Sequence, residues 1–315
     1  MRPQDNLTAA STFSATELLK AYFELTKPRI AALILIVSMA SYFIADRGMQ
    51  DIPRALLTFA VVATLAAGIF ALNHYLERDR DLLMRRTGNR PLPSGKVRPR
   101  DALIFGLTLT LFSLMLSAAF VNVLTACVGL FTAVAYLLVY TPLKRHTAYH
   151  TSLGALAGAT PPLMGWAAAR GDLGPDAWIL FGILFFWQFP HFLSIDMIYR
   201  EDYERAGILV LPVVDKTGHR VAAEIIGALV LLLAVTLLPL VTGLVGGQAA
   251  RAVATTGPIS VGSWIYGALA TVLGLWFLAV GIQAVRLNTK TAARNLLRAS
   301  VFYLPLIFIA IIAYS

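Results

Sequence analysis

Four oxygen-bearing side chains lie within one short stretch of the chain. Asn73, Glu77 and Asp81 follow one another at intervals of four residues, and Asp79 lies between the last two. If the preceding apolar segment is a helix that continues to residue 81, the first three share one face, with successive Cβ atoms about 5–6 Å apart. Carboxylates repel one another, and Mg²⁺, which binds carboxylate oxygens, substrate phosphates and water, is a common reason to gather them. The alternative is a solvated helix end in which residues 77–80 form surface ion pairs, and the spacing alone does not decide between the two.

A second group of ionisable residues follows a later apolar segment. His191 and Asp202 fall on one face of a helix with about 3.6 residues per turn, and Pro190 can kink or restart that helix just before the face begins. Asp196 and Arg200 are four residues apart, so an ion pair would explain both. A histidine near an apolar membrane segment is a functional candidate, but a hydrogen bond to a neighbouring helix explains it equally well.

Both groups have the same place relative to the apolar segments. The first group follows the second apolar segment of the chain (residues 55–76), and the second group follows the sixth (residues 177–198). Because both segments are even-numbered, we expect the two groups on one side of the membrane, facing each other across one cavity. Carboxylates alone would repel a phosphorylated substrate, but bound Mg²⁺ reverses the local charge, and lysine and arginine bind phosphate oxygens. The basic candidates for such contacts, which membrane topology alone would also explain, are Lys27, Arg29, Arg85, Arg86, Arg90, Lys144, Arg145 and Arg200. The combination predicts a membrane-embedded site for Mg²⁺ and a diphosphate.

The composition indicates a chain that is surrounded mostly by lipid. Hydrophobic residues make up 58% of the 315 residues, charged residues 14%, and the mean hydropathy is +0.71, whereas soluble domains average roughly 45–50% apolar and about 25% charged residues. The single cysteine, Cys127, excludes an internal disulfide and a cysteine-based metal centre. We assign the net charge of +9 to membrane topology and expect no nucleic-acid partner.

Nine apolar segments have the length needed to cross a hydrocarbon core of about 30 Å. They cover residues 30–46, 55–76, 102–120, 121–141, 149–169, 177–198, 221–244, 262–285 and 296–314. The third and fourth are almost continuous, so residues 121–123 must form the turn between them. We therefore predict an all-α, polytopic integral membrane protein with one domain over residues 1–315, in which residues 1–20 form a mobile tail.

The basic residues predict the orientation of this bundle. The N-terminal segment and the connections after even-numbered segments, together with Arg298 in the first turn of the last segment, hold 22 Lys and Arg residues, and the other connections hold 4. By the positive-inside rule, the N-terminus and the candidate site lie on the cytoplasmic side and the C-terminus lies outside. The N-terminal residues resemble neither a signal peptide nor a mitochondrial presequence, so we expect a prokaryotic plasma membrane.

The pattern resembles the UbiA superfamily of intramembrane aromatic prenyltransferases, and within it most closely the protoheme IX farnesyltransferase (haem O synthase) branch. The similar stretches cover residues 25–29, 73–95, 140–145, 158–166, 189–205 and 211–215. Pro-His-Phe at 190–192 followed by Arg-Glu-Asp-Tyr at 200–203 is typical of the haem branch. Glu77 and His74 depart from the superfamily pattern, because aspartate is expected at both positions.

The resemblance implies a role for each candidate residue. Asn73, Glu77, Asp81 and Asp202 would be catalytic, and together with Asp79 they would bind Mg²⁺ on the prenyl diphosphate. Besides the basic residues given above, His191 and Tyr199 would bind substrate, with His191 at the haem end. The implied substrates are farnesyl diphosphate and haem B, and a haem A synthase or an assembly factor of a terminal oxidase is an implied partner.

The implied reaction is transfer of a farnesyl group to a vinyl group of haem B with addition of water, which gives haem O and diphosphate. A UbiA-type prenyltransferase with a quinone precursor or another acceptor would share the fold and the Mg²⁺ site. A transporter is a further alternative, but its key charges are expected near the middle of the membrane, whereas the carboxylates here lie at predicted helix ends.

Overall fold

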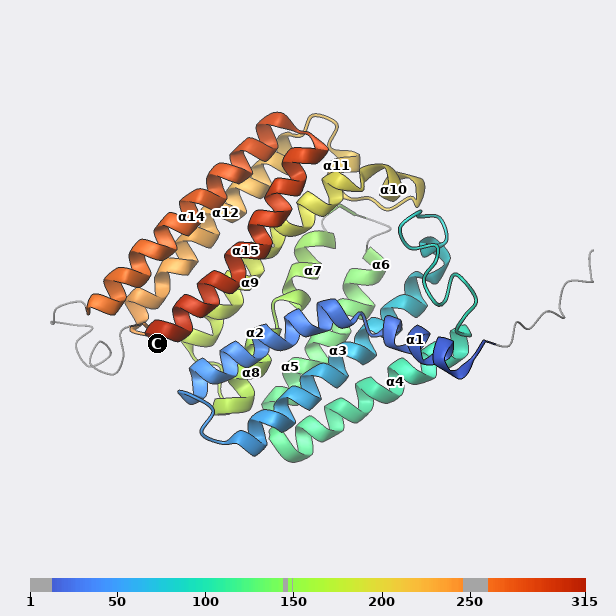
Figure 1. Cartoon of the computed structure of the whole chain (residues 1–315), viewed down its shortest axis with the longest axis horizontal. Coiled ribbons are helices and arrows are strands. Elements are labelled where there is room, and N and C mark those ends of the chain that lie inside the picture. The colour runs from blue at the N-terminus through green and yellow to red at the C-terminus, as the bar shows by residue number, and fades with distance from the viewer. Residues whose placement is uncertain (1–12, 144–146, 149, 246–259) are drawn as a thin grey trace, which may run out of the picture.

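The computed structural model describes residues 13–143, 147–148, 150–245 and 260–315, and within these residues the secondary structure is helical, with no strand (Figure 1). The elements follow one another as α1 (Ala15–Leu25), α2 (Pro28–Asp46), α3 (Ile52–Asp81), α4 (Pro99–Leu116), the π-helical turn η1 (Ser117–Val121), α5 (Val123–Val134), the π-helical turn η2 (Ala135–Tyr140), α6 (Thr141–Leu143), α7 (His150–Gly158), α8 (Pro161–Arg170), α9 (Pro175–Ile198), α10 (Arg200–Arg205), α11 (Leu211–Val214), α12 (His219–Thr242), α14 (Val261–Leu287) and α15 (Lys290–Tyr314). The predicted all-α class is confirmed.

Prolines and side-chain caps mark the starts of the long helices. Helices α2, α4 and α9 begin with proline, whose fixed φ suits the first helical turn and whose missing N–H is not needed there. Before α3, the Asp51 carboxylate accepts a hydrogen bond from the backbone N–H of Arg54 at 3.0 Å. Before α15, the Thr289 hydroxyl accepts one from Ala292 at 3.2 Å. These caps satisfy N–H groups that have no partner inside the helix.

The predicted turn at residues 121–123 is confirmed. Asn122 has an extended backbone, with φ −170° and ψ 162°, between η1 and α5. Its side chain accepts a hydrogen bond from the backbone N–H of Thr125 at 2.8 Å and donates one to the backbone oxygen of Ala167 in α8 at 2.8 Å. Asn122 therefore both starts α5 and ties the turn to a neighbouring helix.

Eight helices of the described residues are long and apolar enough to cross a membrane. They match eight of the nine predicted segments, and the predicted fifth, 149–169, instead forms the two shorter helices α7 and α8. Two consecutive prolines, Pro161 and Pro162, follow the break, and because neither has an N–H to donate to the preceding turn, they favour the start of a new helix there. Nine continuous spans is thus the wrong description of residues 149–169.

The helices pack in two groups that face each other. Helices α9, α12, α14 and α15 contact one another, and α2, α3, α4, α5 and α8 form the second group. Small residues allow close approach in the second group, as in other membrane bundles. At Gly165 of α8, an added Cβ would lie 2.0 Å from the backbone oxygen of Ser38 in α2. This contact requires glycine.

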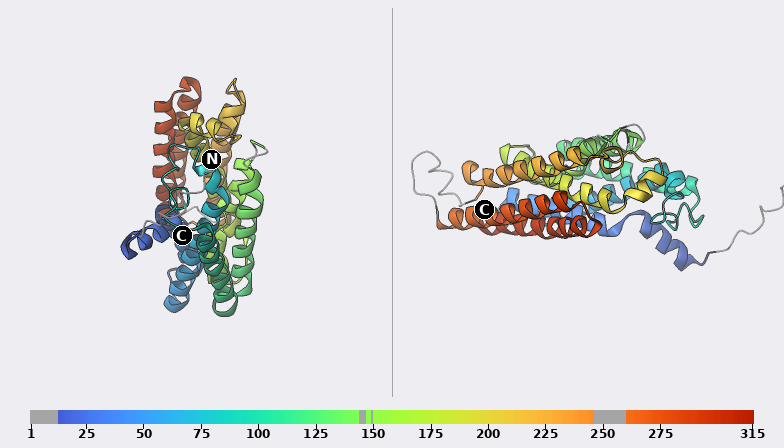
Figure 2. Two further views of the ribbon diagram at one scale, coloured as in Figure 1. Left: turned by 90° about the vertical axis from the view of Figure 1, so that its right-hand side faces the viewer. Right: turned by 90° about the horizontal axis from the view of Figure 1, so that it is seen from above.

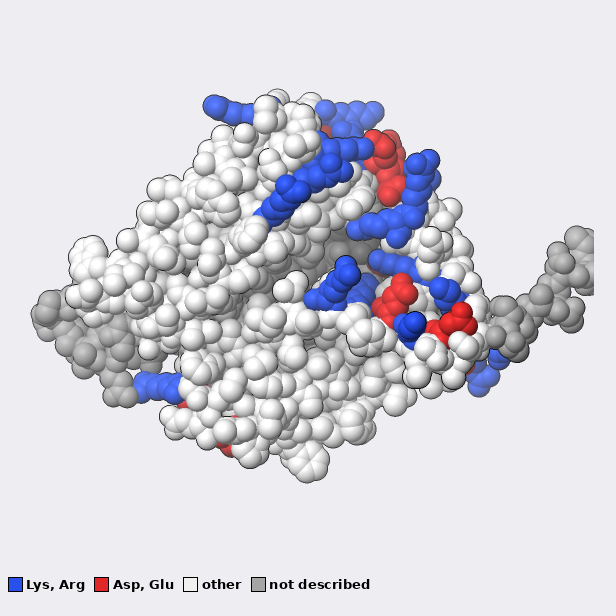
Figure 3. Space-filling model, in the orientation of Figure 1, with Lys and Arg blue, Asp and Glu red and all other residues white. Residues whose placement is uncertain are grey.

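The connections at one end of the bundle carry most of the charged residues. Figure 3 shows Lys, Arg, Asp and Glu side chains gathered around the end where α10 and α11 lie in Figure 1. Residues 15–20 of the predicted mobile tail form the start of α1, whose Ala21 and Leu25 are buried, and the mobility of the tail stays a prediction. Figure 2 shows α1 pointing away from the bundle at this end. Residues 1–12 lie outside the described part of the chain.

Candidate active site at the end of helix α3

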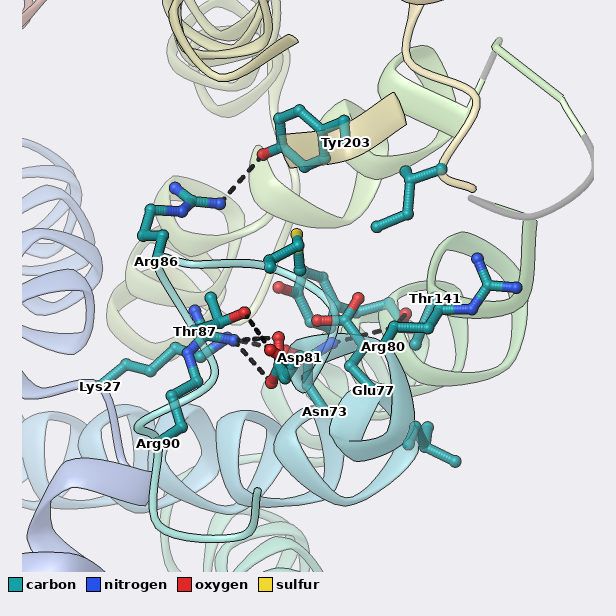
Figure 4. Close-up of a pocket in the computed structure, with 14 residues that line it drawn as sticks. Lys27, Asn73, Glu77, Arg80, Asp81, Arg86, Thr87, Arg90, Thr141 and Tyr203 are labelled. Atoms are coloured by element: carbon teal, nitrogen blue, oxygen red, sulfur yellow. Dashed lines mark hydrogen bonds and ion pairs between the residues drawn. The ribbon is translucent and has the colours of Figure 1, made fainter. Parts of the chain in front are cut away.

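A cavity of about 150 Å³ lies at the charged end of the bundle (Figure 4). Helix α3 and the 82–98 connection supply most of its wall, with further residues from η2, α10 and the segment before α2. The lining residues are Lys27, Asn73, Leu76, Glu77, Arg80, Asp81, Met84, Arg86, Thr87, Arg90, Tyr136, Thr141, Tyr203 and Ile208. Four of the charged lining residues are cationic and two are anionic, a net charge of +2 that attracts an anion.

Asn73, Glu77 and Asp81 lie together as the helical spacing predicts. All three line the cavity from one face of α3. Asp79 lies outside it, with a side chain that is 74% exposed and 3.6 Å from the guanidinium of Arg78. The surface ion pair that the alternative interpretation predicted therefore forms at Asp79, while the other three oxygen-bearing residues form a shared wall.

Lys27 joins the segment before α2 to this wall. Its ammonium donates a hydrogen bond to the Oδ1 atom of Asn73 at 2.7 Å and lies 5.2 Å from the centroid of the Phe70 ring. The Asn73 amide nitrogen lies 3.3 Å from the hydroxyl of Thr141, to which it donates. Lys27 has φ 47°, a left-handed conformation that is uncommon for residues other than glycine and is often retained at functional sites. The local backbone thus holds a cation over the start of the acidic face.

Asp81 and Arg90 form an ion pair at the wall of the cavity. The Nη1 atom of Arg90 lies 2.9 Å and 2.8 Å from the two carboxylate oxygens of Asp81. The Asp81 side chain is 0% exposed, whereas that of Arg90 is 25% exposed. The hydroxyl of Thr87 donates to the Asp81 backbone oxygen at 2.9 Å. These contacts hold the 82–98 connection against the end of α3.

Three of the predicted basic residues lie outside the cavity lining. Lys27, Arg86 and Arg90 line the cavity, while Arg29, Arg85 and Arg200 do not. Lys144 and Arg145 lie outside the described residues. Arg29 and Arg85 are exposed, and a substrate contact by the three arginines outside the cavity stays a prediction.

Arg86 links the first acidic group to the second. Its guanidinium lies 3.2 Å from the hydroxyl of Tyr203, to which it donates, and its centre lies 4.6 Å from the Tyr199 ring. Tyr203 lines the cavity, but Asp202 does not: its carboxylate is 3.1 Å from Arg205. The two groups therefore contact each other through Arg86 from the 82–98 connection and through Tyr199 and Tyr203 from the second group.

The predicted continuous helix face from His191 to Asp202 is wrong. Helix α9 passes through Pro190 and ends at Ile198, and Tyr199, with φ −107° and ψ 21°, turns the chain into α10. His191 accordingly lies outside the cavity lining. Its Nδ1 atom is 2.8 Å from the Ser300 hydroxyl of α15, and Asp196 is buried.

Sequence reasoning missed several lining residues. Arg80 follows Asn73 by seven residues, a spacing of two helical turns that places it on the same helix face. Thr87, Tyr136 and Thr141 reach the cavity from other segments, and no local spacing relates them to α3.

The donor set of the cavity fits a magnesium ion. Mg²⁺ prefers oxygen ligands and is commonly held by one or two carboxylates together with substrate phosphates and water. Glu77, Asp81 and the Asn73 amide offer such oxygens on one wall. Within the described part of the chain, no group of three or more His, Cys, Asp or Glu side chains is placed to share a metal ion. The predicted ligation by all five residues, Asp79 and Asp202 included, stays a prediction, and only three of the five line the cavity.

The model of the UbiA prenyltransferase family matches residues 34–311. The chain belongs to the UbiA prenyltransferase family. It is 42% identical over 299 residues to the protoheme IX farnesyltransferase of Solibacter usitatus (strain Ellin6076), and the aligned region covers 92% of this chain and 97% of that protein. It is 41% identical over 292 residues to the protoheme IX farnesyltransferase of Opitutus terrae, covering 92% and 93%. This UbiA family chain is therefore an integral-membrane prenyltransferase, which contradicts the transporter alternative.

Solved structures share the fold of this UbiA family member. A structure of digeranylgeranylglyceryl phosphate synthase has a TM-score of 0.73 and 20% identity, covering 95% of this chain and 98% of that chain. A UbiA homologue from Archaeoglobus fulgidus bound to DMAPP and Mg²⁺ has a TM-score of 0.59 and 16% identity, covering 92% and 98%. That homologue thus holds DMAPP together with Mg²⁺.

Proposed function

We propose that this prenyltransferase transfers a farnesyl group from farnesyl diphosphate to a vinyl group of haem B, with addition of water, and releases haem O and diphosphate. The observation that supports this most is 42% identity, over 92% of the chain, to a protein named protoheme IX farnesyltransferase. The cavity at the end of α3 adds chemical support, because cations and carboxylate oxygens line one small space there.

The diphosphate would bind in this cavity. Lys27, Arg80, Arg86 and Arg90 supply cationic donors to its oxygens, and the planar fork of arginine suits phosphate well. Glu77, Asp81 and the Asn73 amide would hold Mg²⁺, which supplies positive charge that stabilises the leaving diphosphate. Asp81 holds Arg90 at 2.8 Å, so the pair also fixes the guanidinium at the wall.

The reaction begins when the bond between C1 of the farnesyl group and the diphosphate oxygen breaks. The diphosphate leaves with the electron pair, and Lys27 and the arginines stabilise its charge. The allylic cation must be shielded from water, and an aromatic face attracts a cation. Tyr136 lines the cavity, with its ring centroid 6.2 Å from that of Phe70 in an edge-on contact. These two rings are suited to cover the cation.

The acceptor then supplies the electrons for the new carbon–carbon bond. The π electrons of the haem vinyl group attack C1 of the farnesyl cation, which moves the positive charge to the vinyl carbon next to the porphyrin ring. Water adds to that carbon and loses a proton, which gives the hydroxyl group of haem O. We assign the haem end to α9 with His191, whose ring is only partly buried.

We further propose that the charged end of the bundle faces the cytoplasm across a prokaryotic plasma membrane. Basic residues gather at this end (Figure 3), as the positive-inside rule expects. The partnership with a haem A synthase or an oxidase assembly factor stays a prediction. To test the orientation, a cysteine placed at exposed Arg85 in a Cys127→Ser background should react with an impermeant maleimide only in inverted membrane vesicles. Reaction only in right-side-out cells would contradict the orientation.

Competition between acceptors tests the proposed reaction against its main alternative. Purified protein in detergent receives farnesyl diphosphate and Mg²⁺ with equal concentrations of haem B and an aromatic quinone precursor, and the products are separated by mass. We expect prenylated haem alone, loss of the product with EDTA, and its return when Mg²⁺ is added in excess. Prenylated quinone precursor without prenylated haem would favour the other acceptor class and refute the proposal.

A further inference from the structure

Ser300 of α15 is the centre of a polar contact between two membrane helices. Its side chain is 0% exposed. The hydroxyl donates a hydrogen bond to the backbone oxygen of Leu297 at 2.7 Å and lies 2.8 Å from the Nδ1 atom of His191 in α9. The backbone oxygen of Ser300 accepts a hydrogen bond from the indole N–H of Trp187 at 2.7 Å. Ser300 therefore joins α15 to α9 through both its side chain and its backbone.

The hydrogen bonds around Ser300 favour one tautomer of His191. A hydroxyl has one proton to donate, and a carbonyl oxygen such as that of Leu297 can only accept. With the Ser300 hydroxyl donating to Leu297, its oxygen is left to accept from His191, and in this arrangement the imidazole proton is on Nδ1. The lone pair of the neutral ring is therefore on Nε2.

Aromatic packing fixes the plane of the same ring. The Trp187 ring stacks on His191 at a centroid distance of 4.6 Å and an interplanar angle of 22°. Phe192 contacts it edge-on at 5.5 Å. The imidazole therefore cannot rotate without breaking the Ser300 hydrogen bond and disturbing the Trp187 stack.

The Nε2 atom is the part of His191 that stays available. Among the described residues it has no hydrogen-bond partner, and it is not one of the fully buried side-chain atoms that lack one. Figure 3 shows that the face between α2 and α15 is hollowed, and α9, which carries His191, packs against α15 beside it (Figure 1). An oriented lone pair without a hydrogen-bond partner is suited to bind a metal centre.

We infer that Ser300 is a positioning residue for haem binding: it holds His191 in the Nδ1–H tautomer so that Nε2 ligates the iron of haem B. This inference rests on the proposed function, since haem is the acceptor there. Histidines that bind metals generally donate their other ring N–H to a nearby acceptor, which sets the tautomer and raises ligand basicity, and loss of that acceptor lowers metal affinity about 10–100-fold.

Two readouts test this inference without relying on turnover. The first is ¹⁵N NMR of histidine-labelled protein without haem, in which the His191 signals are assigned by their loss in His191→Ala. We expect the Nδ1–H tautomer in the unmodified protein and in Ser300→Thr, which keeps a hydroxyl, and a mixture of tautomers in Ser300→Ala. The Nε2–H tautomer in the unmodified protein would overturn the inference.

The second readout is titration with ferric haem B, followed by its absorption and electron paramagnetic resonance spectra. Ser300→Ala should lower haem affinity about 10–100-fold, Ser300→Thr should retain it, and His191→Ala should lose the imidazole-type spectrum until free imidazole is added. Ser113→Ala is the matched control, because Ser113 is also buried in the bundle and donates at 2.7 Å to a backbone oxygen of a neighbouring helix. It should bind haem normally.

The outcomes separate this inference from the proposed function. Wild-type affinity and spectrum in Ser300→Ala, or an imidazole-type spectrum in His191→Ala, would overturn the inference while prenylation of haem by the unmodified protein still supports the proposed function. Absence of both haem binding and haem prenylation in the unmodified protein would refute both. Since Trp187 bonds to the backbone of Ser300, Ser300→Ala keeps that contact between the helices.

Discussion

Replacing Asp81 by asparagine separates the structural role of this residue from its chemical role. The substitution keeps the shape of the side chain but removes the charge that lies 2.8 Å from Arg90. Loss of one partner of a buried ion pair costs about 3–5 kcal/mol, because the other charge stays desolvated and unpaired. Arg90 retains 25% exposure and can recruit water, so we expect the lower end, about 3 kcal/mol of unfolding free energy.

Activity should fall for a different reason. Asp81 is also an oxygen donor on the wall that would hold Mg²⁺ and diphosphate, and removing one such electrostatic contact commonly lowers kcat by about 100-fold to 1,000-fold. The single variants Asp81→Asn and Arg90→Gln and the double variant are compared by detergent unfolding and by haem prenylation. In the double variant two neutral amides replace the pair, so stability should partly recover while activity should not.

One result of this comparison of single and double variants would refute the reasoning. Recovery of activity together with stability in the double variant would mean that Asp81 only holds Arg90 and the 82–98 connection in place. The control is Asp101→Asn, at an exposed position in the first turn of α4, which should change neither quantity.

Three further predictions concern parts of the molecule that support the site. Gly165→Ala should destabilise the bundle by about 1–3 kcal/mol through overpacking, since its Cβ would lie 2.0 Å from the Ser38 backbone oxygen. Gly227→Ala is the control, because an added Cβ there has no atom within 4 Å and should not destabilise the bundle. Equal unfolding temperatures of the two variants would contradict this prediction. Tyr203→Phe removes the hydroxyl that lies 3.2 Å from the guanidinium of Arg86. Loss of this one hydrogen bond should weaken farnesyl diphosphate binding about fivefold, the effect of about 1 kcal/mol. Unchanged binding would contradict this prediction. Burial acts to raise the pKa of Asp215, but hydrogen bonds from a hydroxyl and three backbone N–H groups outweigh it and lower the pKa to about 2. Its stabilisation is therefore complete above the unfolded pKa of about 3.9 and is lost as the pH falls through about 2, so Asp215→Ala should lower the unfolding temperature at pH 6 and make no difference at the acid limit.

Local periodicity predicted the parts of the site that lie on one element. Asn73, Glu77 and Asp81 line one cavity because their spacing repeats once per helical turn and α3 continues to Asp81. The same helical repeat also predicts Arg80, seven residues after Asn73, on the cavity face. Hydropathy likewise predicted the long helices, because lipid-facing segments must be continuous and apolar.

Contacts between elements could not be predicted in this way. The turn at Tyr199 separates His191 from Asp202, and just after α10 the residues Ala206 and Ile208 share a buried apolar cluster with Met84 of the 82–98 connection. Ser300 lies in an apolar segment whose sequence predicts a membrane helix and no more. Its contact with His191 at 2.8 Å joins residues that lie more than a hundred positions apart in the chain. Long-range partners of this kind require the tertiary structure.

The most direct test of the proposed reaction is the mass of the haem product formed in water enriched in oxygen-18. Purified protein is incubated with haem B, farnesyl diphosphate and Mg²⁺, and the haem fraction is analysed by mass spectrometry. Transfer to the vinyl group with water addition predicts a haem that carries one farnesyl group and one oxygen-18 atom, with release of diphosphate. A haem that stays unmodified while farnesol accumulates, or a farnesylated haem without oxygen-18, would contradict the proposed reaction.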